Sequence, residues 1–445
     1  MVTRLSASDA SFYQLENTAT PMYVGLLLIL RRPRAGLSYE ALLETVEQRL
    51  PQIPRYRQKV QEVKLGLARP VWIDDRDFDI TYHVRRSALP SPGSDEQLHE
   101  LIARLAARPL DKSRPLWEMY LVEGLEKNRI ALYTKSHQAL INGVTALAIG
   151  HVIADRTRRP PAFPEDIWVP ERDPGTTRLL LVTNSGQLVE TGRKVLDIAR
   201  TVARGTAPSS PLNATVSRNR RFTVARASLD DYRTVRARYD CDVHDVVLTV
   251  IAGALGNWLM SRGEAVAPTA TVRAMAPLSV YADDQLDSTG PGQAISQVTP
   301  FLVDLPVGEG NAVVRLSQIA HATESNPTAA SLVDARTIVT LSGLAPATLH
   351  AMGVRVATSF SARLFNLLIT NAPGTQSQMY IAGTKLLETY SVPPLLHNQA
   401  LAISVTSYNG MLYFGINADR DAMSDVDLLP GLLSQALDEL LEASR

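Results

Sequence analysis

Apolar residues recur with strand-like and helix-like spacings in turn along the first third of the chain. Tyr23–Leu30 is a nearly unbroken apolar run that predicts a buried strand, whereas Ser38–Leu50 and Asp95–Ala107 each place their apolar residues on one helical stripe. Val71–Val84 is predicted to be extended, with turns. This alternation indicates a layered α/β or α+β domain over residues 1–155.

The second half, from residue 221 to residue 445, repeats this plan loosely. Asn409-Gly410 lies between two apolar runs and is the strongest hairpin signal in the chain. A final amphipathic helix is expected after Asp425, which is placed to cap it. The other predicted elements are helices at Asp230–Tyr239, Val243–Arg262, Asn311–Thr323 and Ala345–Leu368, and strands at Thr271–Val280, Leu401–Tyr408 and Met411–Ala418.

Residues 156–220 differ in character from both halves. Arg158–Pro174 is rich in Pro, Arg and Asp, and Leu179–Ala203 is a long stretch with helical character. We therefore predict three parts: a domain over residues 1–155, a helical crossover linker over residues 156–220, and a second domain over residues 221–445.

The composition is that of a globular protein without a dominant charge. The 445 residues suit two domains, and 45 basic residues balance 45 acidic ones, so no overall field favours nucleic acid as a partner. The single cysteine suits a reducing cytoplasm. The longest apolar run, Met22–Leu30, is about half of the ~20 residues that a spanning helix needs, so we expect a soluble or peripheral protein.

Polar residues gather at the end of one apolar strand, in Tyr133–Gly143, which reads Y-T-K-S-H-Q-A-L-I-N-G. The run predicts a strand, a polar tip and the start of a helix, with a turn at Asn142-Gly143. On spacing alone, the simpler interpretation is a buried histidine beside a turn. A concentration of Lys, His, Gln and Asn at one strand end is also the kind of cluster that carries chemistry.

The segment resembles the active-site motif HHxxxDG of the bacterial wax ester synthase/diacylglycerol acyltransferase family, which a Lys usually precedes by two residues. His137 takes the place of the first His, Gln138 the second, Asn142 the Asp and Gly143 the Gly. The motif is therefore degenerate at two of its four positions.

The resemblance extends along most of the chain and in the family's order. The matching blocks are L-S-A-S-D-A-S-F-Y-Q-L-E from Leu5, P-L-D-K-S-R-P-L-W-E from Pro109, H-D-V-V-L from His244, R-A-M-A-P-L-S-V from Arg273, T-N-A-P-G from Thr370 and S-Y-N-G-M-L-Y-F-G-I from Ser407. In style they are nearest to the actinobacterial triacylglycerol synthases.

This resemblance implies two chloramphenicol-acetyltransferase-like domains, each a mixed sheet flanked by helices, with a substrate tunnel between them. It also implies transfer of a fatty acyl group from acyl-CoA, as substrate and without a cofactor, to diacylglycerol or a long-chain alcohol. We expect no metal, because no metal-ligand spacing is present. A cytoplasmic location is expected, with or without peripheral attachment to the membrane or to lipid inclusions.

The chemistry depends on position 138. Acyl transfer to a hydroxyl needs a base, and in the family the second His supplies it. Gln138 has no usable proton affinity, so it cannot be that base. His137 should face away, because successive strand residues point to opposite faces, although a distorted strand end would allow it to take over. Asn142 stands where the family has its Asp, which would orient the imidazole of the second His. Its replacement fits the replacement of that His by Gln138.

Other candidates come from the remaining blocks. Pro115, Leu116 and Trp117 are either a packing anchor or part of the substrate tunnel, and Asn371, Pro373 and Gly374 are expected to line the domain interface. Asp245 is expected to cap a helix or to interact with its dipole. His244 is either a second base or a solvent-facing residue, and we expect it to face solvent. The basic clusters Arg31–Arg34 and Arg218–Arg221 are also expected to face solvent, unless they bind CoA phosphates or anionic lipid.

Three functions therefore remain open. The first is an acyltransferase of weak or altered activity that makes triacylglycerol or wax ester. The second is a non-catalytic homologue that binds acyl-CoA or neutral lipid, or that pairs with an active relative. The third is a condensation-type domain acting on carrier-protein thioesters, which fits less well because the Pro-Leu-Trp and Asn-Ala-Pro-Gly blocks belong to the neutral-lipid enzymes.

Overall fold

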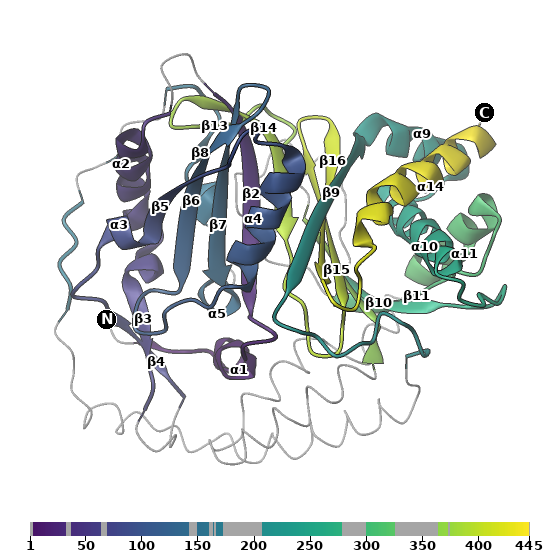
Figure 1. The fold of residues 1–445 in the computed structure, drawn as a ribbon, viewed down its shortest axis with the longest axis horizontal. Coiled ribbons are helices and arrows are strands. Elements are labelled where there is room, and N and C mark those ends of the chain that lie inside the picture. The colour runs from purple at the N-terminus through teal and green to yellow at the C-terminus, as the bar shows by residue number, and fades with distance from the viewer. Residues whose placement is uncertain are drawn as a thin grey trace.

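The computed structural model has two halves, each built on one large sheet (Figure 1). It describes residues 3–32, 37–63, 69–141, 149–159, 163, 166–171, 207–277, 300–324, 364–372 and 374–444. The predicted helix at Leu179–Ala203 and most of that at Ala345–Leu368 lie outside these residues.

The first sheet has seven strands in the order β5-β6-β7-β2-β14-β13-β8. It is mixed, because β5 and β6 are parallel and the other neighbours are antiparallel. Its strands are β5 (Val84–Ala88), β6 (Trp117–Leu125), β7 (Arg129–His137), β2 (Tyr23–Arg31), β14 (Thr384–Val392), β13 (Tyr380–Ile381) and β8 (Ala154–Asp155).

Helices and a small three-stranded sheet complete this half. The helices are α1 (Ala7–Leu15), α2 (Tyr39–Arg49), α3 (Ile80–His83), α4 (Asp95–Ala107), α5 (Gln138–Ile141), α6 (Ile149–Val152) and the 3-10 turns η1 (Leu50–Gln52) and η2 (Pro54–Arg57). The small sheet has the order β1 (Thr3–Arg4), β4 (Val71–Asp74) and β3 (Gln58–Gln61).

The second sheet has six strands in the order β11-β10-β12-β15-β16-β9. Its helices gather on the outer side, away from the first half (Figure 1). The strands are β9 (Arg220–Ser228), β10 (Val272–Pro277), β11 (Pro300–Leu305), β12 (Leu367–Ala372), β15 (Leu401–Tyr408) and β16 (Met411–Asp419); the helices are α9 (Leu229–Tyr239), α10 (Val243–Ser261), α11 (Ala312–Glu324), η5 (Val426–Leu428) and α14 (Leu429–Ala443).

Helix α10 forms the centre of the second core. In the described part of the chain it is the one helix long and apolar enough to cross a membrane, but 89% of that apolar window is buried inside the protein. Helices α9, α11 and α14 all contact it. Its hydrophobicity is therefore that of a core helix.

The two halves share a strand. Strand β14 comes from the C-terminal half of the sequence, yet it pairs with β2 in the first sheet and also packs against β15 and β16 of the second. Side chains of the second sheet donate to backbone carbonyls along β14: Tyr408 Oη to Leu386, Tyr413 Oη to Leu387 and Ser404 Oγ to Ser391. The division at residues 155 and 220 remains a prediction, but residues 380–392 belong to the first sheet.

Most predicted elements of the described chain are confirmed. Helix α4 has the predicted bounds, because Ser94 and Gln97 form a capping box at its start. Three details are wrong: Ile80–His83 is helical rather than extended, Leu367–Leu368 belongs to strand β12, and Asp425 caps no helix with its side chain, which instead accepts hydrogen bonds from Trp258 and Arg262.

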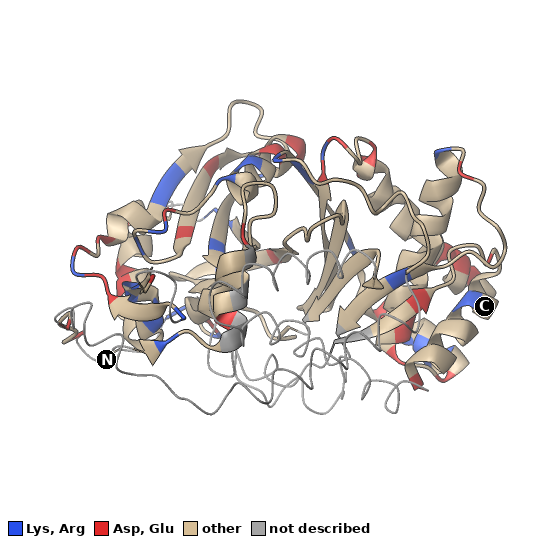
Figure 2. Ribbon diagram, turned by 90° about the horizontal axis from the view of Figure 1, so that it is seen from below, with Lys and Arg blue, Asp and Glu red and all other residues tan. Residues whose placement is uncertain are grey.

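Residues of both charge signs are distributed along the ribbon of both halves (Figure 2). One member of the expected basic surface is buried instead. Arg220 is only 7% exposed and donates to the carbonyl oxygens of Ser217, Asn219 and Ala19. Burial lowers the pKa of Arg220 to about 10, and the solvent-facing role predicted for it is wrong.

Close packing between β14 and β16 gives a test of this shared strand. A Cβ at Gly415 would lie 1.9 Å from the carbonyl oxygen of Ser391, so Gly415→Ala should lower the free energy of unfolding by roughly 3 kcal/mol or more. Urea unfolding measures the loss. The matched control is Gly431→Ala in α14, where nothing lies within 4 Å of the added Cβ, and no loss is expected. Equal stability of the two variants would contradict the packing.

Candidate active site

The end of strand β7 is held on both sides by backbone hydrogen bonds. His137 N donates to Leu116 O at 2.9 Å, and Gln138 N donates to Met22 O at 2.8 Å. The first bond ties the motif to the Pro-Leu-Trp block and the second ties it to the segment before β2. Helix α5 begins at Gln138, immediately after the strand.

His137 is enclosed by aromatic side chains. It is fully buried, and its ring centroid lies 6.0 Å from that of Tyr13 and 5.9 Å from that of Tyr23. Its Nδ1 accepts a hydrogen bond from Ala139 N at 2.9 Å. Because a backbone N–H can only donate, Nδ1 carries the lone pair, and the neutral ring keeps its proton on Nε2. Burial lowers the pKa of His137 to about 4.

These bonds give His137 a structural task. Ser136 and His137 point to opposite faces of β7: Ser136 Oγ lies 3.2 Å from the hydroxyl of Tyr56, whereas His137 packs against Tyr13 and Tyr23. The one lone pair of the neutral ring already binds Ala139 N, in the first turn of α5. In this arrangement His137 supports the backbone that carries Gln138 and does not offer a base.

Glu16, which the sequence analysis did not single out, lies beside this histidine. Its Oε2 is 3.8 Å from His137 Nε2 and 2.7 Å from Lys112 Nζ, and the carboxylate is 5% exposed. Lys112 in turn lies over the ring of Tyr13. The sequence did contain a pointer to Glu16, because this residue ends the family block L-S-A-S-D-A-S-F-Y-Q-L-E. The block folds as α1 and its C-terminal cap.

Lys135 is a buried charged residue in strand β7, and its contacts explain why it is there. Its Nζ is fully buried and donates to Leu105 O at 3.0 Å and Arg108 O at 2.8 Å, at the C-terminal end of α4. Unsatisfied carbonyls at a helix C-terminus attract a cation. Burial nonetheless lowers the pKa of Lys135 to about 8, against the attraction of Glu118 at 3.4 Å.

The Pro-Leu-Trp block lies in the core beside the motif. Leu116 and Trp117 are fully buried, and Trp117 Nε1 donates to Tyr56 O at 2.8 Å. The indole stacks on His83, with ring centroids 4.5 Å apart and planes at 14°. These contacts are those of a packing anchor, and a substrate-binding role for Pro115, Leu116 and Trp117 remains a prediction.

A second buried polar pair lies in the other half. Asn371, near the end of β12, places its Nδ2 3.1 Å from Nδ1 of His244, in the first turn of α10. His244 is only 4% exposed, so the expectation that it faces solvent is wrong. Asp245 Oδ2 accepts from Asp242 N at 2.9 Å, in a capping box that begins α10.

The other predicted site residues are placed only in part. Gly374 N donates to Ser407 Oγ at 3.1 Å, and a Cβ on Gly374 would lie 2.1 Å from Ser407 O, so this position requires glycine. Gln138 is half-buried. Asn142, Gly143 and Pro373 lie outside the described residues. Among the described residues, no cluster of three or more His, Cys, Asp or Glu is arranged to hold a metal ion.

Comparison with known proteins decides the family. Residues 5–247 match the model of the wax ester synthase/diacylglycerol acyltransferase catalytic domain, and residues 296–441 match that of the WS/DGAT C-terminal domain. The chain belongs to this family. The expected fold class, with mixed sheets flanked by helices, is thereby confirmed for the acyltransferase.

Relatives of this WS/DGAT protein occur in mycobacteria. A probable diacylglycerol O-acyltransferase of Mycobacterium tuberculosis (strain H37Rv) is 91% identical over 266 residues, covering 54% of this chain and 98% of that relative. Another from the same strain is 29% identical over 458 residues, covering 100% of this chain and 97% of that relative.

Solved structures agree with this assignment. The wax ester synthase/diacylglycerol acyltransferase of Marinobacter aquaeolei VT8 superposes with a TM-score of 0.73 at 25% identity, covering 99% of this chain and 100% of that one. The first condensation domain of the CDA synthetase reaches a TM-score of 0.60 at 13% identity, covering 100% and 97%. The second likeness is one of fold alone.

Buried neutral histidines make the stability of this WS/DGAT protein depend on pH. Burial lowers the pKa of His83, His137 and His244 from 6.5 to about 4. Below pH 6.5 the unfolded chain takes up protons that the folded chain refuses, so the free energy of unfolding should fall as the pH falls from 6.5 to 4. The loss is on the order of 3 kcal/mol for each histidine at pH 4.

Urea unfolding between pH 7 and pH 4.5 measures this dependence. His83→Phe should reduce the slope by up to one proton, because Phe keeps the stacking on Trp117 but cannot titrate. Gln48→Ala, which removes an exposed side chain of α2 that carries no titratable proton, should leave the slope unchanged. A slope that His83→Phe does not alter would show that this histidine titrates alike in the folded and unfolded chain.

Proposed function

We propose that this WS/DGAT protein transfers a fatty acyl group from acyl-CoA to diacylglycerol or a long-chain alcohol, making triacylglycerol or wax ester, and that it does so weakly. The hydroxyl oxygen of the acceptor attacks the thioester carbonyl, the C–S bond breaks, and the hydroxyl proton ends on the CoA sulfur. Acyl-CoA is a substrate, and no cofactor takes part.

We infer weak turnover from the two residues at the His positions of the motif. Gln138 stands where the family has its base, and an amide accepts no proton at neutral pH. His137 cannot replace it, because Ala139 N occupies its Nδ1 lone pair and Nε2 holds the proton. Proximity of the two substrates still accelerates the reaction without a base, and the hydroxyl proton can leave through water.

A second function is a homologue that binds acyl-CoA or neutral lipid without turning it over, alone or as the partner of an active acyltransferase. Gln138 at the position of the base and the bonded Nδ1 of His137 also favour this function, because a general base typically raises the rate ~10²–10⁴-fold. The two functions differ in one measurable quantity. The first gives product above background, and the second gives binding without product.

Restoring the base should raise the rate. We expect Gln138→His to increase acyl transfer from palmitoyl-CoA to diolein and hexadecanol by about 10²-fold or more, and Gln138→His with Asn142→Asp to increase it further. Radiolabelled product on thin-layer plates measures both. Gln48→His, which adds an imidazole at an exposed position of α2, is the matched control and should change nothing.

Two outcomes would contradict this assignment of roles. If neither substitution raises turnover, the base position is not what limits the reaction. If the unsubstituted protein is fully active and His137→Ala abolishes activity without unfolding the chain, then His137 is the base. The hydrogen bond from Ala139 N must then break during the reaction.

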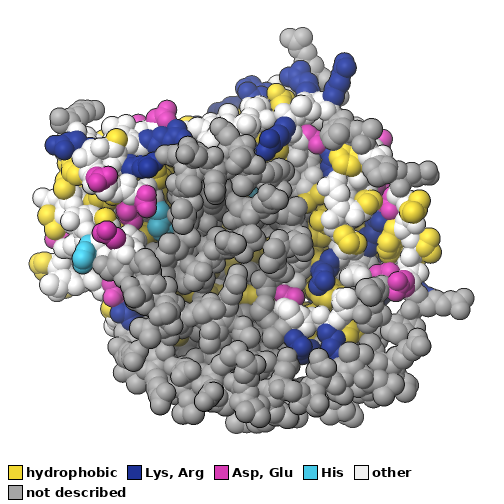
Figure 3. Space-filling model, turned by 180° about the vertical axis from the view of Figure 1, so that it is seen from behind, with side chains coloured by type: hydrophobic (Ala, Val, Ile, Leu, Met, Phe, Trp, Pro, Cys, Tyr) yellow, Lys and Arg dark blue, Asp and Glu magenta, His cyan; other side chains and the backbone are white. Residues whose placement is uncertain are grey.

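For localisation we propose a cytoplasmic protein that attaches peripherally to membranes or lipid inclusions, where its acceptor dissolves. On the back face, hydrophobic and charged side chains are interspersed over the described surface (Figure 3). Two of the large hydrophobic residues that are most exposed, Ile167 at 87% and Val169 at 77%, are two positions apart. Flotation with phosphatidylcholine vesicles, with and without diolein, tests attachment, and Ile167→Ser with Val169→Ser should weaken it.

A further inference from the structure

Arg220 is the first residue of β9, and it lies at the seam where the two halves meet. Its side chain is buried, and its Nη1 donates to Ser217 O at 2.8 Å and to Asn219 O at 3.0 Å, both close by in the sequence. Its Nη2 donates instead to Ala19 O, in the first half. Because a buried charge needs hydrogen-bond partners, this guanidinium ties β9 to the chain that precedes β2.

Ala19 belongs to a turn that Asn17 holds in shape. Asn17 Oδ1 accepts from Ala19 N at 2.8 Å and from Thr20 N at 3.0 Å, and Asn17 Nδ2 donates to Thr20 Oγ1 at 2.6 Å. An Asn side chain that binds the backbone two and three residues ahead is a common way to fix a turn. Arg220 therefore binds a carbonyl whose position is already set by local bonds.

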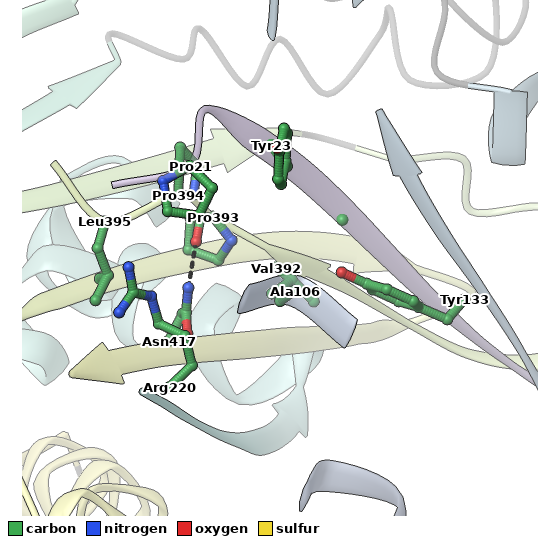
Figure 4. A pocket seen from close by; sticks show the side chains of 11 residues that line it. Pro21, Tyr23, Ala106, Tyr133, Arg220, Val392, Pro393, Pro394, Leu395 and Asn417 are labelled. Atoms are coloured by element: carbon green, nitrogen blue, oxygen red, sulfur yellow. Dashed lines mark hydrogen bonds between the residues drawn. The ribbon is translucent and has the colours of Figure 1, made fainter. Parts of the chain in front are cut away.

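A short, buried connection leads from this turn to the motif. Pro21 and Met22 are buried, and the proline ring limits the backbone rotation of the connection. Met22 O accepts from Gln138 N at 2.8 Å. Pro21 and Arg220 line the same small cavity at the seam, together with Asn417 (Figure 4). A side chain of the second half therefore lies beside the segment that holds residue 138.

The bond between Met22 and Gln138 is the last rung between the chain of β2 and that of β7. The final residue pair of the two strands is Tyr23 with His137, and the chain begins α5 immediately afterwards. Terminal hydrogen bonds of a ladder open more readily than central ones, because they have neighbours on one side only. The position of residue 138 therefore depends on how firmly the chain before β2 is held.

We propose that Arg220 is a positioning residue for the motif. By holding Ala19 from the second half, it keeps Met22 O in place as the acceptor for the backbone N–H of residue 138. The placement of the residue at the family's base position then depends on the docking of the two halves. This inference rests on the proposed function in one respect, because the placement affects a rate only if acyl transfer occurs.

Amide hydrogen exchange at Gln138, measured by NMR on the full chain, tests this connection without any substrate. Arg220→Met removes the guanidinium, whereas Arg220→Lys keeps a cation that can donate to Ala19 O. Asn17→Ala removes the side-chain bonds of the turn and leaves Arg220 unchanged. We expect Arg220→Met and Asn17→Ala each to speed exchange at Gln138 by roughly tenfold or more, and Arg220→Lys to restore slow exchange in part.

The matched control is Arg315→Met. Arg315 is also a buried arginine, but it lies in α11 and its Nη2 is 3.5 Å from Glu439 Oε2, within the second half. Its loss should destabilise the fold, as the loss of Arg220 does. Exchange at Gln138 should nevertheless stay as slow as in the unsubstituted protein, because a terminal amide exchanges by local opening.

The same substitutions in the Gln138→His protein give a catalytic readout. Arg220→Met should lower kcat for acyl transfer from palmitoyl-CoA to diolein by roughly tenfold, because a misplaced base slows the chemical step. The KM for palmitoyl-CoA should be unchanged. Arg220→Lys should recover most of kcat, and Arg315→Met should leave kcat as it is.

Two exchange results would overturn the proposal: exchange at Gln138 that is equally slow in Arg220→Met and the unsubstituted protein, or equally fast in Arg220→Met and Arg315→Met. If Arg220→Met does not fold, Asn17→Ala decides, and unchanged exchange in that variant also overturns the proposal. The fate of the proposed function is separate. If Gln138→His shows no turnover, acyl transfer is contradicted, whereas faster exchange in Arg220→Met still supports the positioning role.

Discussion

The shared strand β14 is the constraint on which the arrangement of the two halves depends. Along one edge it pairs with β2, which pairs with β7, and its carbonyls accept hydrogen bonds from Tyr408, Tyr413 and Ser404 of the second sheet. The motif at the end of β7 is therefore only two strands away from the seam. Any shift of the second sheet is transmitted through β14, because close-packed interfaces deform little.

At the end of β7, the residues that hold the fold differ from the residue at the position of the family's base. Lys135 caps α4, and His137 binds the first turn of α5, so both residues hold the fold through bonds that Gln138 does not make. The one hydrogen bond described for Gln138 comes from its backbone N–H, which any residue other than proline supplies. The fold therefore places little demand on the side chain at position 138, so His and Gln can exchange there at little cost to folding.

Local signals explain which parts of the fold the sequence predicts. Helix α4 and the hairpin of β15 and β16 follow from a capping box, from amphipathic spacing and from Asn409-Gly410, all of which act within a few residues. The transfer of β14 into the first sheet has no such signal, because pairing between residues some 360 positions apart is decided by tertiary packing. Burial of His244 and Arg220 was missed for a similar reason, because each has a partner on a distant segment: Asn371 for His244 and the carbonyl of Ala19 for Arg220.

One buried polar group at the seam is not explained by packing. A buried amide oxygen without a partner costs about 1–3 kcal/mol, and Asn417 carries this cost beside a cavity, where an apolar residue would relieve it. Position 138 begins α5, whereas Asn417 lies in β16, so the residue that our proposal makes responsible for slow turnover is separate from the buried polar group at the seam.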